Sequence, residues 1–241
     1  MTGARQQILN SLRRSLRREQ PDAETRAELE QRLAAPRANL IPQRAQIPHG
    51  AQLDLMAQML KELSATVVRL GDESEVPQAV ADYLKNENLP PKLRLAPRDD
   101  LRRLPWDGQP LLEVEEGIAE ADDTTSVTGA FAGIAETGTI MMASGPEAPV
   151  TLNFLPENHI VVLRASQVTG SYEDAWQRLR AALGPGVMPR AVNMVTGPSR
   201  TGDIEQTILL GAHGPRRLHV LLVDDASGDR SGDSAGARSE G

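Results

Sequence analysis

The sequence predicts an α/β protein with a mainly parallel sheet flanked by helices. Short apolar runs alternate with longer amphipathic stretches, which gives the strand–helix–strand order of parallel sheets with right-handed crossovers. The runs at residues 160–163 and 218–223 are almost entirely apolar, as expected for strands that are covered on both faces. At 241 residues the chain is long enough to bury one large core.

Residues 1–48 are predicted to form an N-terminal helical extension and a proline-containing linker. Apolar side chains recur at helical spacing at Ile8, Leu12 and Leu16, and helix formers continue through residues 22–33. Arginines crowd the rest of the first helix: Arg5, Arg13, Arg14, Arg17 and Arg18. Either this basic face is solvated while the leucines pack on the domain or on another subunit, or the helix docks on a partner or a membrane surface.

The predicted α/β domain covers residues 49–225. Leucines and methionines at helical spacing between Leu53 and Leu63 predict its first helix. The following pattern predicts a strand, a helix and a strand at residues 66–70, 76–86 and 92–96.

The rest of the domain continues the alternation. Strands are expected at residues 111–114, 125–134, 139–143, 160–163, 191–195 and 218–223, and helices at residues 172–183 and after Asp203. The turn at residues 136–138 predicts a hairpin or strand reversal. Residues 226–241 hold hardly an apolar side chain, so a disordered tail is expected there.

The apolar run at residues 191–195 stops at a turn that is rich in glycine and polar groups. Gly197 allows close backbone approach, and Ser199, Arg200 and Thr201 offer hydroxyls and a guanidinium fork. Ligands of open α/β sheets bind beyond the carboxyl ends of the strands. The sequence therefore predicts a binding site for a small carboxylate or phosphate in this loop.

A structural interpretation of the same loop stays open. Thr201 could cap a helix whose first turn holds Asp203 and Glu205, where carboxylates favour the positive end of the helix dipole. His213 lies between glycines and is a weak catalytic candidate, although a structural histidine is almost equally compatible. A zinc site from His213 with either carboxylate lacks any supporting ligand spacing, so no metal is predicted.

Composition excludes several classes. The net charge of −7 argues against a nucleic-acid binder, and no apolar run approaches the roughly 20 residues that cross a bilayer. The chain contains no cysteine, which excludes disulfides, a cysteine nucleophile and cysteine-bound clusters within it. The beginning lacks a secretory pattern, so the cytoplasm is the expected location. Esterase, dinucleotide-binding and P-loop motifs are absent from the sequence.

Four ordered segments resemble one known family. They are AETGTI at residues 135–140, LPENHIVV at residues 155–162, GPSRTGDIE at residues 197–205, and GAHGP at residues 211–215 followed by the strand at residues 218–223. In this order they resemble the LUD domain, and most closely the lactate-utilisation protein C (LutC/YkgG) family. Glu157 departs from a second proline that is common there, and residues 146–151 lack an arginine that often precedes this segment.

The resemblance implies a fold like that of the NagB/ribose-5-phosphate isomerase/CoA-transferase group. It also implies a component of a system that oxidises L-lactate to pyruvate, with two iron–sulfur partner subunits, one of which contains its own LUD domain. The clusters would then lie in the partners, and this chain, with no cofactor of its own, would contribute an anion pocket, an assembly surface or both. A homo-oligomer is also compatible.

Glu136 is the candidate catalytic residue. The turn of Glu136, Thr137 and Gly138 is expected to meet the Gly197 loop at the carboxyl edge of the sheet, which would bring a carboxylate close to Arg200. By analogy with CoA transferases, Glu136 would be a general base or a nucleophile, with Thr137 and Gly138 contacting the ligand. Alternatively, Glu136 pairs with Arg200 or caps a turn.

These observations leave three hypotheses. The first is the lactate-oxidising component, in which Arg200 would bind the substrate carboxylate with help from Ser199, Thr201 and Asp203. The second is an independent transferase or isomerase for a phosphorylated or CoA-linked small molecule. The third is an assembly or regulatory module without a ligand.

Overall fold

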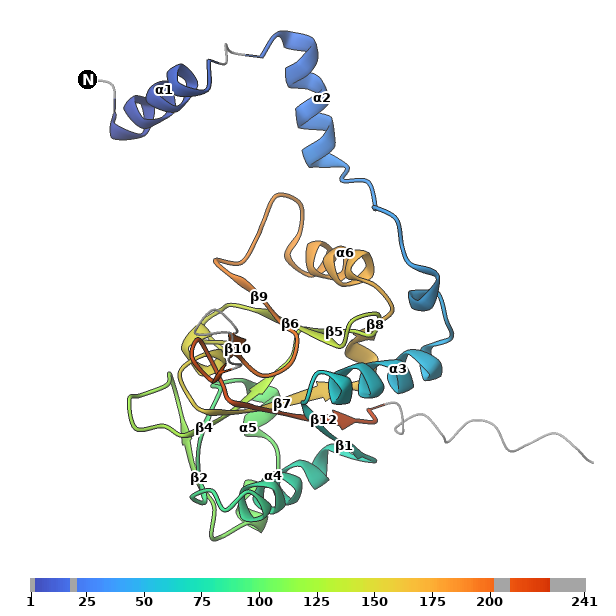
Figure 1. Ribbon diagram of the computed structural model, residues 1–241, viewed down its shortest axis with the longest axis vertical. Helices are drawn as coiled ribbons and strands as arrows, with labels where there is room; N and C mark the ends of the chain where they lie inside the picture. The colour runs from blue at the N-terminus through green and yellow to red at the C-terminus, as the bar shows by residue number, and fades with distance from the viewer. Residues whose placement is uncertain (1–2, 18–20, 202–208, 226–241) are drawn as a thin grey trace, which may run out of the picture.

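The computed structural model describes residues 3–17, 21–201 and 209–225. Its main body consists of two stacked sheets with helices on their outer faces, and a separate two-stranded antiparallel pair is also present (Figure 1). Helix α6 (Tyr172–Leu183) covers the smaller sheet, and α4 (Val76–Asn86) covers the larger one at the opposite end. Helix α3 (His49–Glu62) packs between the two sheets.

The larger sheet has six strands, and all of its pairings are parallel. Their spatial order is β1 (Thr66–Leu70), β12 (Arg217–Val223), β7 (Asn158–Arg164), β4 (Thr125–Gly129), β2 (Lys92–Leu95) and β3 (Glu113–Glu116). The predicted α/β class with a mainly parallel sheet is thus confirmed. Residues 160–163 of β7 are fully buried, as their apolar run predicts.

The predicted helices form for identifiable reasons. Helix α4 places Val76, Val80 and Leu84 on one face at intervals of four residues, and this face packs against the parallel sheet. Helix α6 begins with a capping box, in which Ser171 and Asp174 each accept a backbone N–H of the other residue. Both helices have the predicted bounds.

The smaller sheet was not predicted. The expected single strand at residues 125–134 is wrong, because the chain leaves the parallel sheet after Gly129 and forms β5 (Ala132–Ile134) in a second sheet. The strand order there is β8 (Val168–Thr169), β5, β6 (Thr139–Ala143) and β9 (Val192–Val195). The predicted hairpin between β5 and β6 is present. Strand β9 pairs antiparallel with β6 and is only partly buried, so the apolar run at residues 191–195 forms a strand, but in the smaller sheet and not in the parallel one.

The core between the sheets is aliphatic. Met56 and Leu60 of α3 are fully buried against Val161 and Leu163 of β7 and against Ile140 of β6. Burying each of these side chains contributes about 1.5–3 kcal/mol, so α3 anchors the two sheets to each other.

The N-terminal helices α1 (Ala4–Leu16) and α2 (Ala23–Ala34) stand away from the two sheets (Figure 1). Neither buries a residue. None of the helices in the described ranges combines the length and apolar character that a membrane span needs. The expected helix after Asp203 and the expected disordered tail at residues 226–241 lie outside the described residues.

Candidate functional site

The Gly197 loop lies at the amino edge of the parallel sheet. The Ser199 N–H donates to the carbonyl of Pro215, just before β12 begins, and Arg200 Nη2 donates to the carbonyl of Leu63, just before β1 begins (2.8 and 2.9 Å). The expectation of a carboxyl-edge site is therefore wrong. Because β9 belongs to the smaller sheet, the end of this strand is not tied to the carboxyl edge of the larger one.

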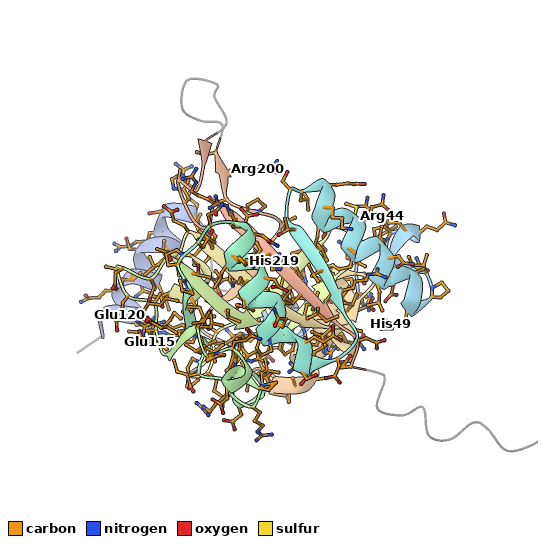
Figure 2. The ribbon with its side chains drawn as sticks, turned by 90° about the horizontal axis from the view of Figure 1, so that it is seen from below. Arg44, His49, Glu115, Glu120, Arg200 and His219 are labelled. Carbon is orange, nitrogen blue, oxygen red and sulfur yellow. The ribbon has the colours of Figure 1, made fainter. Side chains whose placement is uncertain are left out.

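The loop is held against the segment of residues 211–215. The Gly211 N–H donates to the carbonyl of Ser199 at 3.0 Å, and the His213 N–H donates to Ser199 Oγ at 3.4 Å. These hydrogen bonds bring the segment of Ser199 and Arg200 next to the segment of His213. The side chains of Arg200 and His213 are exposed. Figure 2 shows Arg200 at the base of the hairpin formed by β10 (Arg200–Thr201) and β11 (Leu209–Leu210).

The helix that Thr201 would cap in the alternative interpretation falls within residues 202–208, outside the described residues. Thr201 is buried and lies in β10, where it is opposite Leu209 in an antiparallel pair. Asp203, a predicted ligand-binding residue, and Glu205 lie outside the described residues.

Hydroxyl groups join the Glu136 turn to the Gly197 loop. Thr139 Oγ1 lies 2.7 Å from Thr196 Oγ1 and 2.8 Å from both Thr137 Oγ1 and Tyr172 Oη. The two loops therefore meet as predicted, but through Thr139 and Thr196. Neither residue was singled out from the sequence, and neither was Tyr172, because spacing along the chain does not show that a strand end and a helix start converge on the turn.

Glu136 stabilises the start of α6. Its side chain is only 5% exposed, and Oε1 accepts the backbone N–H of Tyr172 at 2.9 Å. A carboxylate at the first turn of a helix is favoured by the positive end of the helix dipole. The expected pairing of Glu136 with Arg200 is wrong. The carboxylate binds the start of α6, whereas the guanidinium binds the carbonyl of Leu63 at the end of α3.

Two glycines let both loops close on the end of α3. Gly138 has a φ of +64°, and a Cβ there would lie 2.8 Å from Met59 Cβ. Gly197 has a φ of +86°, and a Cβ there would lie 2.9 Å from the carbonyl oxygen of Leu63. The predicted need for close backbone approach is thus met, and the atoms approached belong to the protein itself.

The carboxyl edge of the parallel sheet carries a second polar cluster, the ion network. Arg98 donates from Nε and Nη2 to both oxygens of Asp100, at 2.9 and 2.7 Å. Arg164 donates from Nη1 to Asp100 at 2.7 Å and also pairs with Glu73. Arg98 additionally donates to the carbonyl of Gly129 at the end of β4. The network therefore connects the carboxyl ends of four parallel strands, β1, β2, β4 and β7.

The electrostatic interactions in this network favour the ionised form of Asp100. Burial acts to raise the pKa of Asp100, but the hydrogen bonds and positive charges of Arg98 and Arg164 outweigh it and lower the pKa to about 2. The sequence contained a usable signal, because Arg98 and Asp100 follow one predicted strand and Arg164 follows another. Carboxyl ends of parallel strands share one edge, so charged residues placed there are brought together.

Two histidines lie within the parallel sheet. His159 Nε2 is 2.7 Å from Thr128 Oγ1, and His219 Nδ1 is 2.7 Å from Thr66 Oγ1. The His219 ring stacks on Tyr83 with a centroid distance of 4.1 Å. Burial lowers the pKa of each imidazole to about 4, so both are neutral at pH 7. Their surroundings are those of structural histidines.

Comparison with known proteins identifies the family to which this fold belongs. Residues 53–223 match the family model of the LUD domain. The chain belongs to the LUD domain family. A crystal structure of a DUF162 family protein from Deinococcus radiodurans has a similar fold, with a TM-score of 0.55 at 21% identity over 73% of this chain and 99% of that one.

Several curated proteins are similar over part of their length. Lactate utilization protein C of Bacillus subtilis is 30% identical over 128 residues, which cover 50% of this chain and 53% of that protein. Uncharacterized protein YkgG of Escherichia coli is 31% identical over 112 residues, with 46% and 48% covered. Uncharacterized protein NMB1437 of Neisseria meningitidis is 40% identical over 96 residues, with 40% of each chain covered. The LUD chain thus spans about half the length of the curated relatives it matches, and the resemblance to lactate utilization protein C is confirmed.

Proposed function

We propose that this LUD protein is a component of a bacterial system that oxidises L-lactate to pyruvate. The observation that carries the proposal is the similarity to proteins named Lactate utilization protein C, together with the LUD domain match over residues 53–223. The fold alone does not identify a reaction, so the proposal depends on these relatives and on the site.

In this proposal the redox centres lie in partner subunits. The 241 residues contain no cysteine, so thiolate ligands for an iron–sulfur cluster have to come from other chains. The partners would be iron–sulfur lactate-utilisation subunits, and the cytoplasm would be the site of assembly. This chain would contribute substrate binding, a surface for assembly or both.

The proposed ligand site is the Gly197 loop. Arg200 Nη2 donates to the carbonyl of Leu63, which holds this side chain at the amino edge of the parallel sheet. A guanidinium has five N–H donors in a planar fork, and the fork matches the two oxygens of a carboxylate. Among the described residues, the bond to Leu63 uses one of these donors. Ser199 and the backbone of Gly197 and Thr201 would form the rest of the site. Thr137 and Gly138 belong to the adjoining turn.

A thermal-shift screen of the purified full chain tests the proposed ligand class. The panel contains L-lactate, pyruvate, a sugar phosphate and a CoA ester. A ligand that binds the folded state at 100 times its dissociation constant stabilises the protein by about 2.7 kcal/mol, which is measurable as a higher melting temperature. We expect L-lactate or pyruvate to raise the melting temperature. A shift produced only by the phosphate or the CoA ester would instead support a transferase or an isomerase and overturn the proposal.

A further inference from the structure

A groove runs between the free edge of the parallel sheet and helix α4. Strand β1 is the last strand in the sheet order, and β12 is its hydrogen-bonded neighbour. The groove has a volume of about 390 Å³ and is lined by β1, α4 and His219 of β12. Figure 2 views the molecule from this side and shows His219 between the helix and the strand. This groove lies apart from the Gly197 loop and from the ion network.

The groove combines an apolar floor with an acidic rim. Val68 of β1, whose surface is 40% exposed, forms the floor together with Ala79 and Tyr83 of α4. Carboxylates border this floor at three positions of the segment that leads into and through α4: Glu75, Asp82 and Glu87. Arg217 pairs with Glu87 at 3.2 Å, so the carboxylates of Glu75 and Asp82 define the negative side. An apolar strip between carboxylates fits an amphipathic, basic helix.

Helix α1 has this complementary chemistry. Ile8, Leu12 and Leu16 are 60%, 52% and 64% exposed, and their spacing of four residues places them on one face. Arg5 lies on this face, three residues before Ile8, and Arg13 lies beside it, and residues 4–17 include no acidic side chain. Within the described part of the chain, the hydrogen bonds of α1 stay inside the helix and its caps. The helix thus presents an apolar stripe and a positive charge to the surroundings.

We propose that α1 of one chain docks in the β1–α4 groove of a second copy, so that two copies exchange their N-terminal helices. In Figure 1, α1 and α4 lie at opposite ends of the molecule, which favours a groove on another copy over the chain's own groove. Each copy supplies both a helix and a groove, so one twofold axis satisfies both contacts in a closed dimer. The apolar stripe of α1 contacts Val68 and Ala79, and its arginines face Glu75 and Asp82.

The first experiment measures the mass of the full chain in solution by light scattering across a range of protein and salt concentrations. The wild-type chain is expected to form a dimer that weakens as salt rises, because the contact includes exposed charges. The double substitution Ile8→Ser with Leu12→Ser removes two apolar side chains from each of the two equivalent contacts. At roughly tenfold for each side chain, it is expected to raise the dimer dissociation constant about 10,000-fold. The matched control is Leu33→Ser, an 83% exposed leucine of α2 that should leave the dimer intact.

The second experiment uses charge reversal in separate chains. A helix variant carries Arg5→Glu with Arg13→Glu, and a groove variant carries Glu75→Lys with Asp82→Lys. Each variant alone places like charges in contact and is expected to be monomeric. Mixed together, they restore opposite charges at both contacts, and a heterodimer is expected.

The two experiments also separate the alternatives. A wild-type chain that stays monomeric at every concentration would overturn the proposal, and so would equal loss of the dimer in the Leu33→Ser control. Charge-reversed variants that fail to combine, while each retains the wild-type melting temperature, would show that the helix occupies its own groove or none. Helix α1 contains no buried residue, so the substitutions in α1 should leave the α/β domain folded. A loss of the dimer in these variants therefore reports on the helix contact and not on unfolding.

Discussion

The two edges of the six-stranded sheet hold polar groups in different ways. At the amino edge, Ser199 and Arg200 come from one continuous loop, and backbone carbonyls hold that loop in place. At the carboxyl edge, Arg98, Asp100 and Arg164 come from separate segments and satisfy one another through ion pairs. The amino edge therefore presents an exposed guanidinium, whereas the carboxyl edge is a mutually neutralised network.

This difference distinguishes the proposed binding site from a cluster with a structural role. Asp100 contacts two arginines and has a strongly lowered pKa. These are properties of a carboxylate that stabilises the positions of its neighbouring side chains. The exposed guanidinium of Arg200 donates, among the described residues, to the backbone carbonyl of Leu63. Changes at the carboxyl edge should consequently reduce stability, while changes at Arg200 should reduce ligand affinity.

The largest loss of stability is expected for Gly138→Ala. The residue has a positive φ, and the new Cβ would approach Met59 Cβ and the Leu60 nitrogen to within 2.8 and 2.9 Å. Strain and overpacking together should cost about 3 kcal/mol in the free energy of unfolding. Chemical denaturation measures this cost. Gly50→Ala in the first turn of α3, where nothing lies within 4 Å, is the matched control and should change stability by less than about 1 kcal/mol.

The next largest effect is expected at the carboxyl edge. Asp100→Asn removes the charge shared by Arg98 and Arg164, leaving two partly buried guanidiniums without their common partner. We expect a loss of about 2 kcal/mol, below the usual cost for a fully buried pair because water reaches this edge. Asp99→Asn, in an exposed pair with Arg102, is the control and should cost less than about 1 kcal/mol. Equal effects of the two substitutions would remove the distinction between the edges.

The same network makes a pH prediction. The pKa of Asp100 is about 2 in the folded protein, below its ordinary value of 3.8. Its stabilising contribution is therefore fully present above about pH 4 and is lost as the pH falls toward 2. Denaturation curves of the wild-type chain and Asp100→Asn should converge over this acid range. A stability difference that stays constant down to pH 2 would contradict the ion network's role.

A smaller effect is expected for Glu136→Gln. The amide oxygen still accepts the Tyr172 N–H, but the favourable interaction of a charge with the start of α6 is lost, at a cost of about 1 kcal/mol. The substitution also tests the catalytic hypothesis in the reconstituted complex. A chemical carboxylate would lose turnover while ligand affinity is kept, whereas the helix-stabilising role predicts lower stability with unchanged turnover.

The sequence predicted elements better than it predicted their arrangement. Helices α4 and α6 and strand β1 have their predicted bounds, because amphipathic period and apolar runs are local signals. The break at Gly129 was missed, because a glycine within a strand-like stretch does not show that the chain passes from one sheet to another. That transfer also decides where the predicted site lies.

The candidate site was predicted in its residues but not in its surroundings. Ser199, Arg200 and His213 were found because they lie in two conspicuous glycine-containing loops. Their position at the amino edge depends on β9 pairing with β6, which is a long-range choice that local patterns do not determine. The ion network was missed although Arg98, Asp100 and Arg164 each follow a predicted strand, because the sequence does not show which strands lie close together in the sheet.

The most direct test of the central claim, that the Gly197 loop at the amino edge binds a small carboxylate through Arg200, is calorimetric titration of L-lactate. The experiment compares the wild-type chain, Arg200→Ala and Arg200→Lys, with Arg103→Ala as a control that removes one exposed charge beside the other edge. Hydrogen bonds to a charged group contribute roughly 1.5–3 kcal/mol each, so both Arg200 variants should bind at least about tenfold more weakly, with stability changed by less than about 0.5 kcal/mol. Arg103→Ala should bind as the wild type does. Wild-type lactate affinity in Arg200→Ala would contradict the claim.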